Sequence, residues 1–158
     1  MSAYSLYINL PGYLSEWLTS HFGNPVTFPY SSPQNAVIRT FLLRPPVDYT
    51  PECNKDKSHT AIAIPASVAK PPERYYYMTD MGKKAVAEAC KDLFLRALWN
   101  DLSPLAEYPV GLNTLIRAWC ESNGIELAHV EAVRQCYYRV RKDFAEKGIN
   151  LRCMTRKR

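Results

Sequence analysis

The sequence predicts an α+β protein in which a small N-terminal unit of mixed strands and helices precedes a C-terminal helical hairpin. Three observations support this prediction. Strand-like alternation and helix-like periodicity interleave over residues 1–104, and only helical periodicity follows over residues 112–158. Between them, two prolines and a glycine fall within residues 103–111, which indicates a linker at residues 105–111. We therefore expect an α+β unit, a short linker, and a helical hairpin that ends in a basic tail.

The N-terminal unit contains segments of both periodicities. Proline begins its first two helices, at Pro11 and Pro33, because the missing N–H is not needed in a first turn. Ser31 or Ser32 is expected to cap the second helix, and Gly23 to end the first. We expect strands at residues 4–10, 26–28, 59–64 and 75–78, helices at 11–22, 33–44 and about 80–102, and loops at 45–58 and 65–72.

Length and composition are those of an ordinary globular protein. The chain has 158 residues, of which 47% are hydrophobic, so it can bury a core without a metal or disulfides. No apolar run reaches the roughly 18 residues that span a bilayer, and no signal peptide is apparent. We expect a cytoplasmic protein with no membrane partner and no cofactor.

The cysteines indicate a reducing compartment. They are odd in number and widely spaced, with no CxxC pair, so they do not form a disulfide framework. Cys120, His129 and Cys136 can converge across a helical hairpin as zinc ligands, but buried thiols beside an ordinary histidine are the interpretation we favour, and we expect no metal. The five cysteines are Cys53, Cys90, Cys120, Cys136 and Cys153.

Positive charge is concentrated at the C-terminus. Residues 1–131 hold 11 basic and 13 acidic residues, a net charge of −2. Residues 132–158 hold nine basic and two acidic residues, a net charge of +7. Such asymmetry is typical of a protein with a polyanionic partner, most often nucleic acid. The alternative is a solvated helix face and a short basic tail that keep the protein soluble.

The hairpin contains a recognisable sequence pattern. Helices are expected at residues 112–122, capped by Asn113, and at about 126–147, with a stop at Asn123 and Gly124 between them. Counted from Ile116, the pattern requires an apolar fourth residue, a small fifth residue and a glycine at the ninth position, which are Trp119, Cys120 and Gly124. It also requires apolar residues at the tenth, fifteenth and eighteenth positions, which are Ile125, Val130 and Val133. Residues 116–135 therefore resemble the helix-turn-helix of DNA-binding proteins, except that Asn123 stands where an apolar residue is preferred. The resemblance implies that the second helix contacts DNA.

A plain antiparallel αα-hairpin explains the same region. The second helix is expected to run for some 20 residues, which is long for a recognition helix. Its apolar stripe also suits a hairpin packed against the first unit. That stripe comprises Leu127, Val130, Val133, Tyr137, Val140 and Phe144.

The opposite face of the second helix favours nucleic acid. Arginine can bind guanine edges or phosphates, glutamine can read adenine, and tyrosine can stack or bind a phosphate. Glu131 lies beside this face. The candidate nucleic-acid-binding residues are Arg134, Gln135, Tyr138, Arg139, Arg141 and Lys142 on the helix, with Arg152, Arg156, Lys157 and Arg158 in the tail.

Other motifs are weaker. The tyrosines at residues 75–77 can form a base-stacking platform, but successive strand residues point to opposite faces, so a half-buried strand is favoured. Gly82 and the two lysines after it lack the remaining residues of a phosphate-binding loop. His21, His59 and His129 are scattered, and no nucleophile motif accompanies them, so we expect no enzyme.

The sequence thus leads to two hypotheses. The first is a non-enzymatic DNA-binding protein, a regulatory or mobile-element accessory factor that uses its basic C-terminal helix, with DNA favoured over RNA. Its N-terminal unit would mediate self-association or bind a protein partner. The second is a protein–protein adaptor or assembly subunit without a nucleic-acid role.

Overall fold

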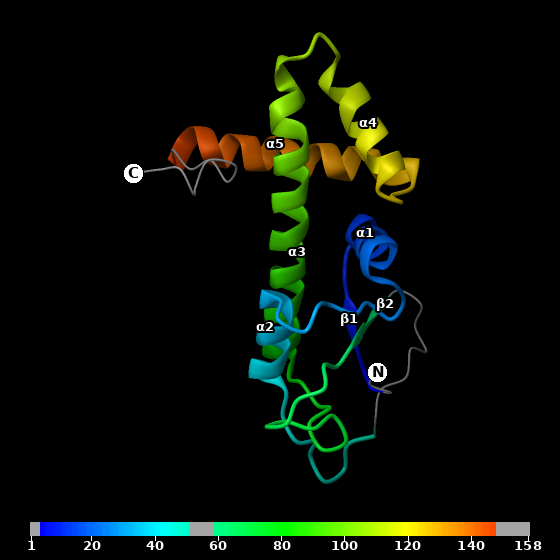
Figure 1. Cartoon of the computed structure of the whole chain (residues 1–158), viewed down its shortest axis with the longest axis vertical. Helices are drawn as coiled ribbons and strands as arrows, with labels where there is room; N and C mark the ends of the chain where they lie inside the picture. Colours follow the sequence, from blue (N-terminus) through cyan, green and yellow to red (C-terminus); the bar gives the residue numbers. More distant parts are fainter. Residues whose placement is uncertain (1–3, 51–58, 148–158) are drawn as a thin grey trace. The chain divides into compact units, whose positions relative to one another are not determined.

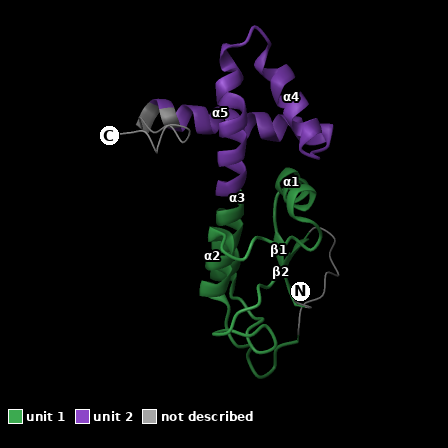
Figure 2. Cartoon of the chain, viewed as in Figure 1, with its two compact units in different colours: residues 1–91 green, residues 92–158 purple. Residues whose placement is uncertain are grey.

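The computed structural model describes residues 4–50 and 59–147 and confirms the α+β class (Figure 1). The chain divides into two compact units, residues 1–91 and residues 92–158 (Figure 2). Their boundary lies inside a long helix, whereas the sequence placed the linker at residues 105–111. In chain order the elements are β1 (Ser5–Asn9), α1 (Gly12–Phe22), α2 (Pro33–Phe41), β2 (His59–Ala63), α3 (Asp80–Leu102), the 3-10 helix η1 (Ser103–Glu107), α4 (Leu112–Ser122), the 3-10 helix η2 (Leu127–His129) and α5 (Val130–Lys147).

Unit 1 is built on a two-stranded antiparallel sheet. Leu6 on β1 lies opposite Ile62 on β2, and both side chains are buried. Alternate residues of each strand face the core, as the period of two predicts. Val26 joins the edge of β2 through a single parallel bridge, with its N–H 2.8 Å from the Ala61 oxygen.

Two of the predicted strands are reduced to isolated bridges. Residues 26–28 contribute only the bridge from Val26 to Ile62, and Pro25 and Pro29 on either side cannot donate further ladder hydrogen bonds. Residues 75–78 contribute only the bridge from Tyr77 to Leu43, because the chain enters α3 three residues after Tyr77.

Side chains close both ends of α2. Its N-cap is Ser32, whose hydroxyl oxygen accepts a hydrogen bond from the Asn35 N–H at 3.2 Å. Of the two predicted caps, Ser31 and Ser32, the second is therefore confirmed. At the other end, the Lys70 ammonium donates to the Arg39 and Leu42 carbonyl oxygens at 2.8 and 2.9 Å. A cation in this position satisfies carbonyls that the helix leaves free.

Unit 2 is a three-helix arrangement, since the end of α3 packs with the predicted hairpin. The Trp119 ring of α4 meets Phe94 edge to face at 5.7 Å between centroids, and its indole N–H donates to the Asp101 carboxylate at 2.8 Å. From α5, Tyr137 stacks on Trp99 at 5.6 Å between centroids. These contacts join α4 and α5 to the same helix, so α5 crosses the unit 2 part of α3 (Figure 1).

No helix in the described ranges combines the length and the apolar character needed to cross a lipid bilayer.

Candidate nucleic-acid interface

The turn between α4 and α5 has the geometry that the glycine predicts. Gly124 adopts a positive φ of 74°, which residues with a side chain rarely adopt. The Ile125 N–H donates to the Cys120 oxygen at 2.9 Å, and the Gly124 N–H to the Glu121 oxygen at 3.5 Å. This pairing is a Schellman motif, and it satisfies the last carbonyls of α4. Asn123 adds a third bond from its side-chain amide to the Trp119 oxygen at 2.8 Å.

The apolar positions of the helix-turn-helix pattern lie mostly in the core of unit 2. Trp119, Cys120, Ile125 and Val133 are buried, while Val130 is half-buried. The polar Asn123 is tolerated at its position because its amide caps α4. The pattern therefore describes the packing of α4 against α5.

Two details of the hairpin differ from the prediction. Asn113 does not cap α4: the helix begins at Leu112, so Gly111 is the N-cap and provides no side chain. Leu127 is 52% exposed, and the inward stripe begins later. Residues 127–129 form the 3-10 turn η2, so the 3.6-residue period starts only with α5. The buried stripe of α5 is Val133, Cys136, Tyr137 and Val140, and the side chain of Phe144 lies outside the described set.

The six helical candidates all lie on one broad surface of α5, which we call the α5 basic face. Arg134 is half-exposed and the other five are exposed. Spacings of three and four residues place Arg134, Tyr138 and Arg141 along one line of the helix. The α5 basic face consists of Arg134, Gln135, Tyr138, Arg139, Arg141 and Lys142, whereas the candidates Arg152, Arg156, Lys157 and Arg158 lie outside the described residues.

The first turn of this face is an internally paired cluster. Glu131 accepts two hydrogen bonds from the Arg134 guanidinium, one of them 2.9 Å long at Nε, and one from the Gln135 amide at 3.1 Å. The Arg134 and Gln135 hydrogen bonds lower the pKa of Glu131. The guanidinium carbon also lies 5.5 Å from the centre of the Tyr138 ring, a cation–π distance. Arg134 is therefore held in place and its charge is largely balanced.

The second part of the face presents two arginines, Arg139 and Arg141, that have no acidic partner among the described residues. Within the described ranges, no ion pair or hydrogen bond engages the Arg139 or Arg141 guanidinium. Both side chains are exposed, so they are available to an anion. The two arginines of α5 that are free to bind an anion thus lie in the middle of the helix.

A hollow beside the first turn of α5 adds a residue that the sequence analysis did not include. It measures about 510 Å³ and brings Arg117 of α4 to the same surface as Arg134. Arg117 is exposed and follows Asn113 by one turn. That spacing was the available signal, but only the packing of α4 on α5 shows that the two arginines share a surface. The polar residues that line the hollow are Asn113, Thr114, Arg117, Glu131 and Arg134.

The three consecutive tyrosines at residues 75–77 all contact neighbouring side chains. Tyr76 stacks on Tyr4 at 5.4 Å between centroids, and Tyr77 meets Tyr49 edge to face at 4.9 Å. The Tyr75 hydroxyl accepts a hydrogen bond from Arg44 at 3.2 Å. Residues 75–77 are half-buried, as expected, but they form a single bridge and not the predicted strand.

The remaining motifs have packing explanations. A Cβ on Gly82 would lie 2.5 Å from Met78 Cγ, so the glycine at this position lets the Met78 side chain pack directly against the backbone of α3. Cys90 and Cys120 are free and fully buried; burial raises their pKa values to about 12 and about 11, which makes both thiols poor nucleophiles at neutral pH. Cys53 and Cys153 lie outside the described residues.

The candidate interface thus consists of the α4–α5 hairpin, the α5 basic face and the hollow beside it. Comparison of the chain with protein-family models, with curated proteins and with solved structures gives no match.

Proposed function

We propose that this protein binds duplex DNA without chemical reaction, as a regulatory or accessory factor, and that the α5 basic face is the contact surface. The observation that carries the proposal is the pair of exposed arginines, Arg139 and Arg141, that have no acidic partner within the described ranges. Exposed arginines on a rigid helix are well suited to phosphates and guanine edges, because the guanidinium offers several donors in a fixed plane.

The dimensions of α5 agree with a major-groove contact. A helix with its side chains is about 10–12 Å wide, and the major groove of B-DNA is about 12 Å wide. The 18 residues of α5 extend over about 27 Å, longer than the stretch that lies within a groove. The first turns therefore supply base contacts through Arg134 and Gln135, and the later turns reach the phosphate backbone through Arg139 and Lys142.

The hollow provides a second contact with the backbone. Asn113 and Thr114 lie in the first turn of α4, and Arg117 follows them on the same exposed surface. Side chains of these types make most protein contacts to DNA phosphates. A phosphate bound there would fix the position of α5 along the groove, because α4 and α5 are joined by the Schellman turn.

A salt-dependent binding assay tests the proposal. A labelled mixed-sequence duplex is titrated with the full chain, and fluorescence anisotropy is followed from low to physiological salt. We expect log Kd to rise with log salt with a slope of several units, because each neutralised phosphate contributes about 0.9. The double variant Arg139→Ala, Arg141→Ala should bind at least about tenfold more weakly and lower the slope by about two.

A matched control separates a local contact from the loss of net charge. The double variant Arg44→Ala, Arg74→Ala removes two exposed arginines from unit 1 and should leave both affinity and slope nearly unchanged. Duplex RNA of the same sequence should bind more weakly, because its deep, narrow major groove does not admit a helix. If the chain fails to bind DNA even at low salt, the proposal is wrong and the adaptor hypothesis takes its place.

A further inference from the structure

The cluster at the start of α5 leaves one edge of the Arg134 guanidinium free. Glu131 accepts hydrogen bonds from the edge that carries Nε and Nη2. The guanidinium has a second edge, formed by the two terminal nitrogens Nη1 and Nη2. Among the described residues, none accepts a hydrogen bond from Nη1, and Nη2 donates to Glu131 alone. Arg134 therefore keeps a pair of parallel N–H donors at its end.

Other contacts hold this guanidinium in one orientation. The Tyr138 ring covers it at a cation–π distance of 5.5 Å, and the Gln135 amide donates to the same Glu131 carboxylate at 3.1 Å. The Arg134 side chain is nevertheless 30% exposed and lines the hollow beside α5. An arginine that is already ordered loses less conformational entropy when it binds. The free edge is thus accessible and points in a fixed direction.

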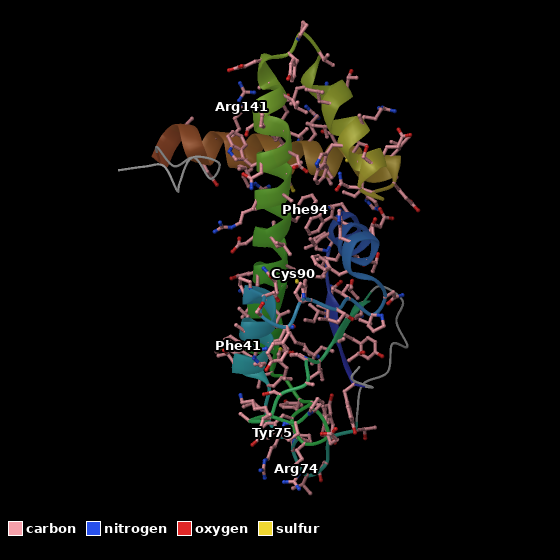
Figure 3. All side chains as sticks on the ribbon, in the orientation of Figure 1. Phe41, Arg74, Tyr75, Cys90, Phe94 and Arg141 are labelled. Atoms are coloured by element: carbon pink, nitrogen blue, oxygen red, sulfur yellow. The ribbon has the colours of Figure 1, made fainter. Side chains whose placement is uncertain are left out.

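The charge of the cluster argues against a phosphate as the partner of Arg134. Glu131 balances the guanidinium, and attraction to phosphates depends on net positive charge and the release of counterions. Arg139 and Arg141 have that charge without an acidic partner in the described ranges. Figure 3 shows Arg141 beside the unit 2 part of α3. It follows Glu131 by ten residues, which is about 15 Å along α5. Phosphate contacts therefore suit the later turns, and the first turn suits a neutral acceptor.

The free edge of Arg134 matches one base in the major groove. Guanine presents two acceptors there, O6 and N7, at a spacing that both terminal nitrogens of an arginine can reach. Adenine presents one acceptor beside an amino donor, and thymine presents one acceptor beside a methyl group. Cytosine presents an amino donor. Only guanine can therefore accept both hydrogen bonds.

We propose that Arg134 reads a guanine base and that Glu131 is its positioning residue. The inference rests on the proposed function, because it assigns a base contact to the same α5 basic face. The two terminal nitrogens of Arg134 donate to O6 and N7 of the guanine, while Glu131 holds the other edge. The preferred ligand is then a duplex with guanine at one fixed position relative to α5.

Selection by the full chain tests the base preference. A pool of duplexes randomised over its central base pairs is bound at low salt, and the retained duplexes are sequenced. We expect guanine to be enriched at one position. The selected duplex is then compared with the same duplex carrying 7-deazaguanine at that position, which still pairs with cytosine but has carbon in place of N7. The wild type should bind the modified duplex about tenfold more weakly.

Three variants assign this ratio of Kd values to its residues. Arg134→Ala should bind both duplexes equally, because it has no donor for N7. Glu131→Gln should reduce the ratio to a few-fold, because Arg134 loses its fixed direction; a Glu131 that served only stability would leave the ratio unchanged. Arg139→Ala should weaken binding to both duplexes by the same factor and preserve the ratio. Thermal melting should show that each variant is folded.

The contrary outcomes distinguish this inference from the proposed function. If the pool binds but no base is enriched, or if the wild type binds the two duplexes equally, Arg134 does not read guanine and the DNA-binding proposal still holds. Enrichment of adenine in place of guanine would assign the base contact to Gln135 and overturn the role of Arg134. Failure to bind any duplex at low salt would reject both proposals.

Discussion

Glu131 binds the Arg134 guanidinium through both carboxylate oxygens, one turn earlier on the same helix. The pair fixes the direction of Arg134 and cancels most of its charge. In the DNA-binding account, the net attraction of the first turn for phosphate is therefore low. Among the described residues, the electrostatic attraction then falls to Arg139, Arg141 and Lys142 of α5 and to Arg117 of α4.

Replacing the carboxylate tests this division of roles. Glu131→Gln removes a negative charge from the surface and releases Arg134, so DNA should bind a few-fold more tightly, with a salt slope steeper by about one. Glu73→Gln, at an exposed position in unit 1, is the matched control and should change neither value. An unchanged salt slope in Glu131→Gln would mean that Arg134 does not face DNA.

The Trp119 to Asp101 hydrogen bond should stabilise unit 2. The indole N–H donates to a carboxylate at 2.8 Å, and Asp101 is exposed, so we expect Trp119→Phe to lower the free energy of unfolding by about 1 kcal/mol. Asp101→Asn should cost less than Asp101→Ala, because an amide oxygen can still accept. Urea unfolding of the single and double variants measures the coupling, and strictly additive changes would contradict the bond.

Gly82 should resist substitution although it lies in a helix. Alanine is ordinarily favoured over glycine in a helix by about 1 kcal/mol. Here its Cβ would lie 2.5 Å from Met78 Cγ and 3.0 Å from Phe41 Cβ, so Gly82→Ala should destabilise the protein by about 1–2 kcal/mol. Gly111→Ala is the control, since its Cβ would meet only Thr114 Oγ1, at 3.9 Å. A stabilising Gly82→Ala would show that the site can relax.

Buried thiols should reduce stability at alkaline pH. The pKa of Cys90 rises from 9.0 to about 12 on burial, so between these values the unfolded chain releases a proton that the folded chain retains. The stabilising contribution is complete below pH 9 and is lost as the pH rises toward 12, by about 1.4 kcal/mol per pH unit. Cys90→Ala should therefore lose less stability than the wild type between pH 9 and pH 11 in urea unfolding. Parallel pH profiles for the two proteins would contradict the assignment.

Local signals in the sequence were sufficient for most elements of the fold. Ser32 caps α2 and Gly124 ends α4 because both effects act over a few residues. The predicted strands at residues 26–28 and 75–78 are single bridges, since strand pairing depends on partners distant in the chain. The sequence predicts Leu127 in the core because its apolar side chain fits the stripe of the following helix. The 3-10 turn at residues 127–129 shifts the period at which side chains face inward, and amino-acid composition does not reveal such a turn.

In the candidate site, too, features within one element could be predicted from the sequence, and features that combine several elements could not. Helical spacing was enough to place the α5 basic face, because its members belong to one element. The hollow combines residues from α4 and the first turns of α5. Arg117 has no unusual neighbours in the sequence, so only tertiary packing reveals that it shares a surface with Arg134.

The central claim is that the α5 basic face contacts DNA, and residue-resolved NMR tests it most directly. A ¹⁵N-labelled sample of the full chain is titrated with a short duplex at low salt, and amide shifts are compared with those of the Arg139→Ala, Arg141→Ala variant. We predict that the largest shifts fall at residues 134–142 and near Arg117, and that they shrink in the variant. Shifts confined to unit 1, or no shifts at saturating DNA, would contradict the account.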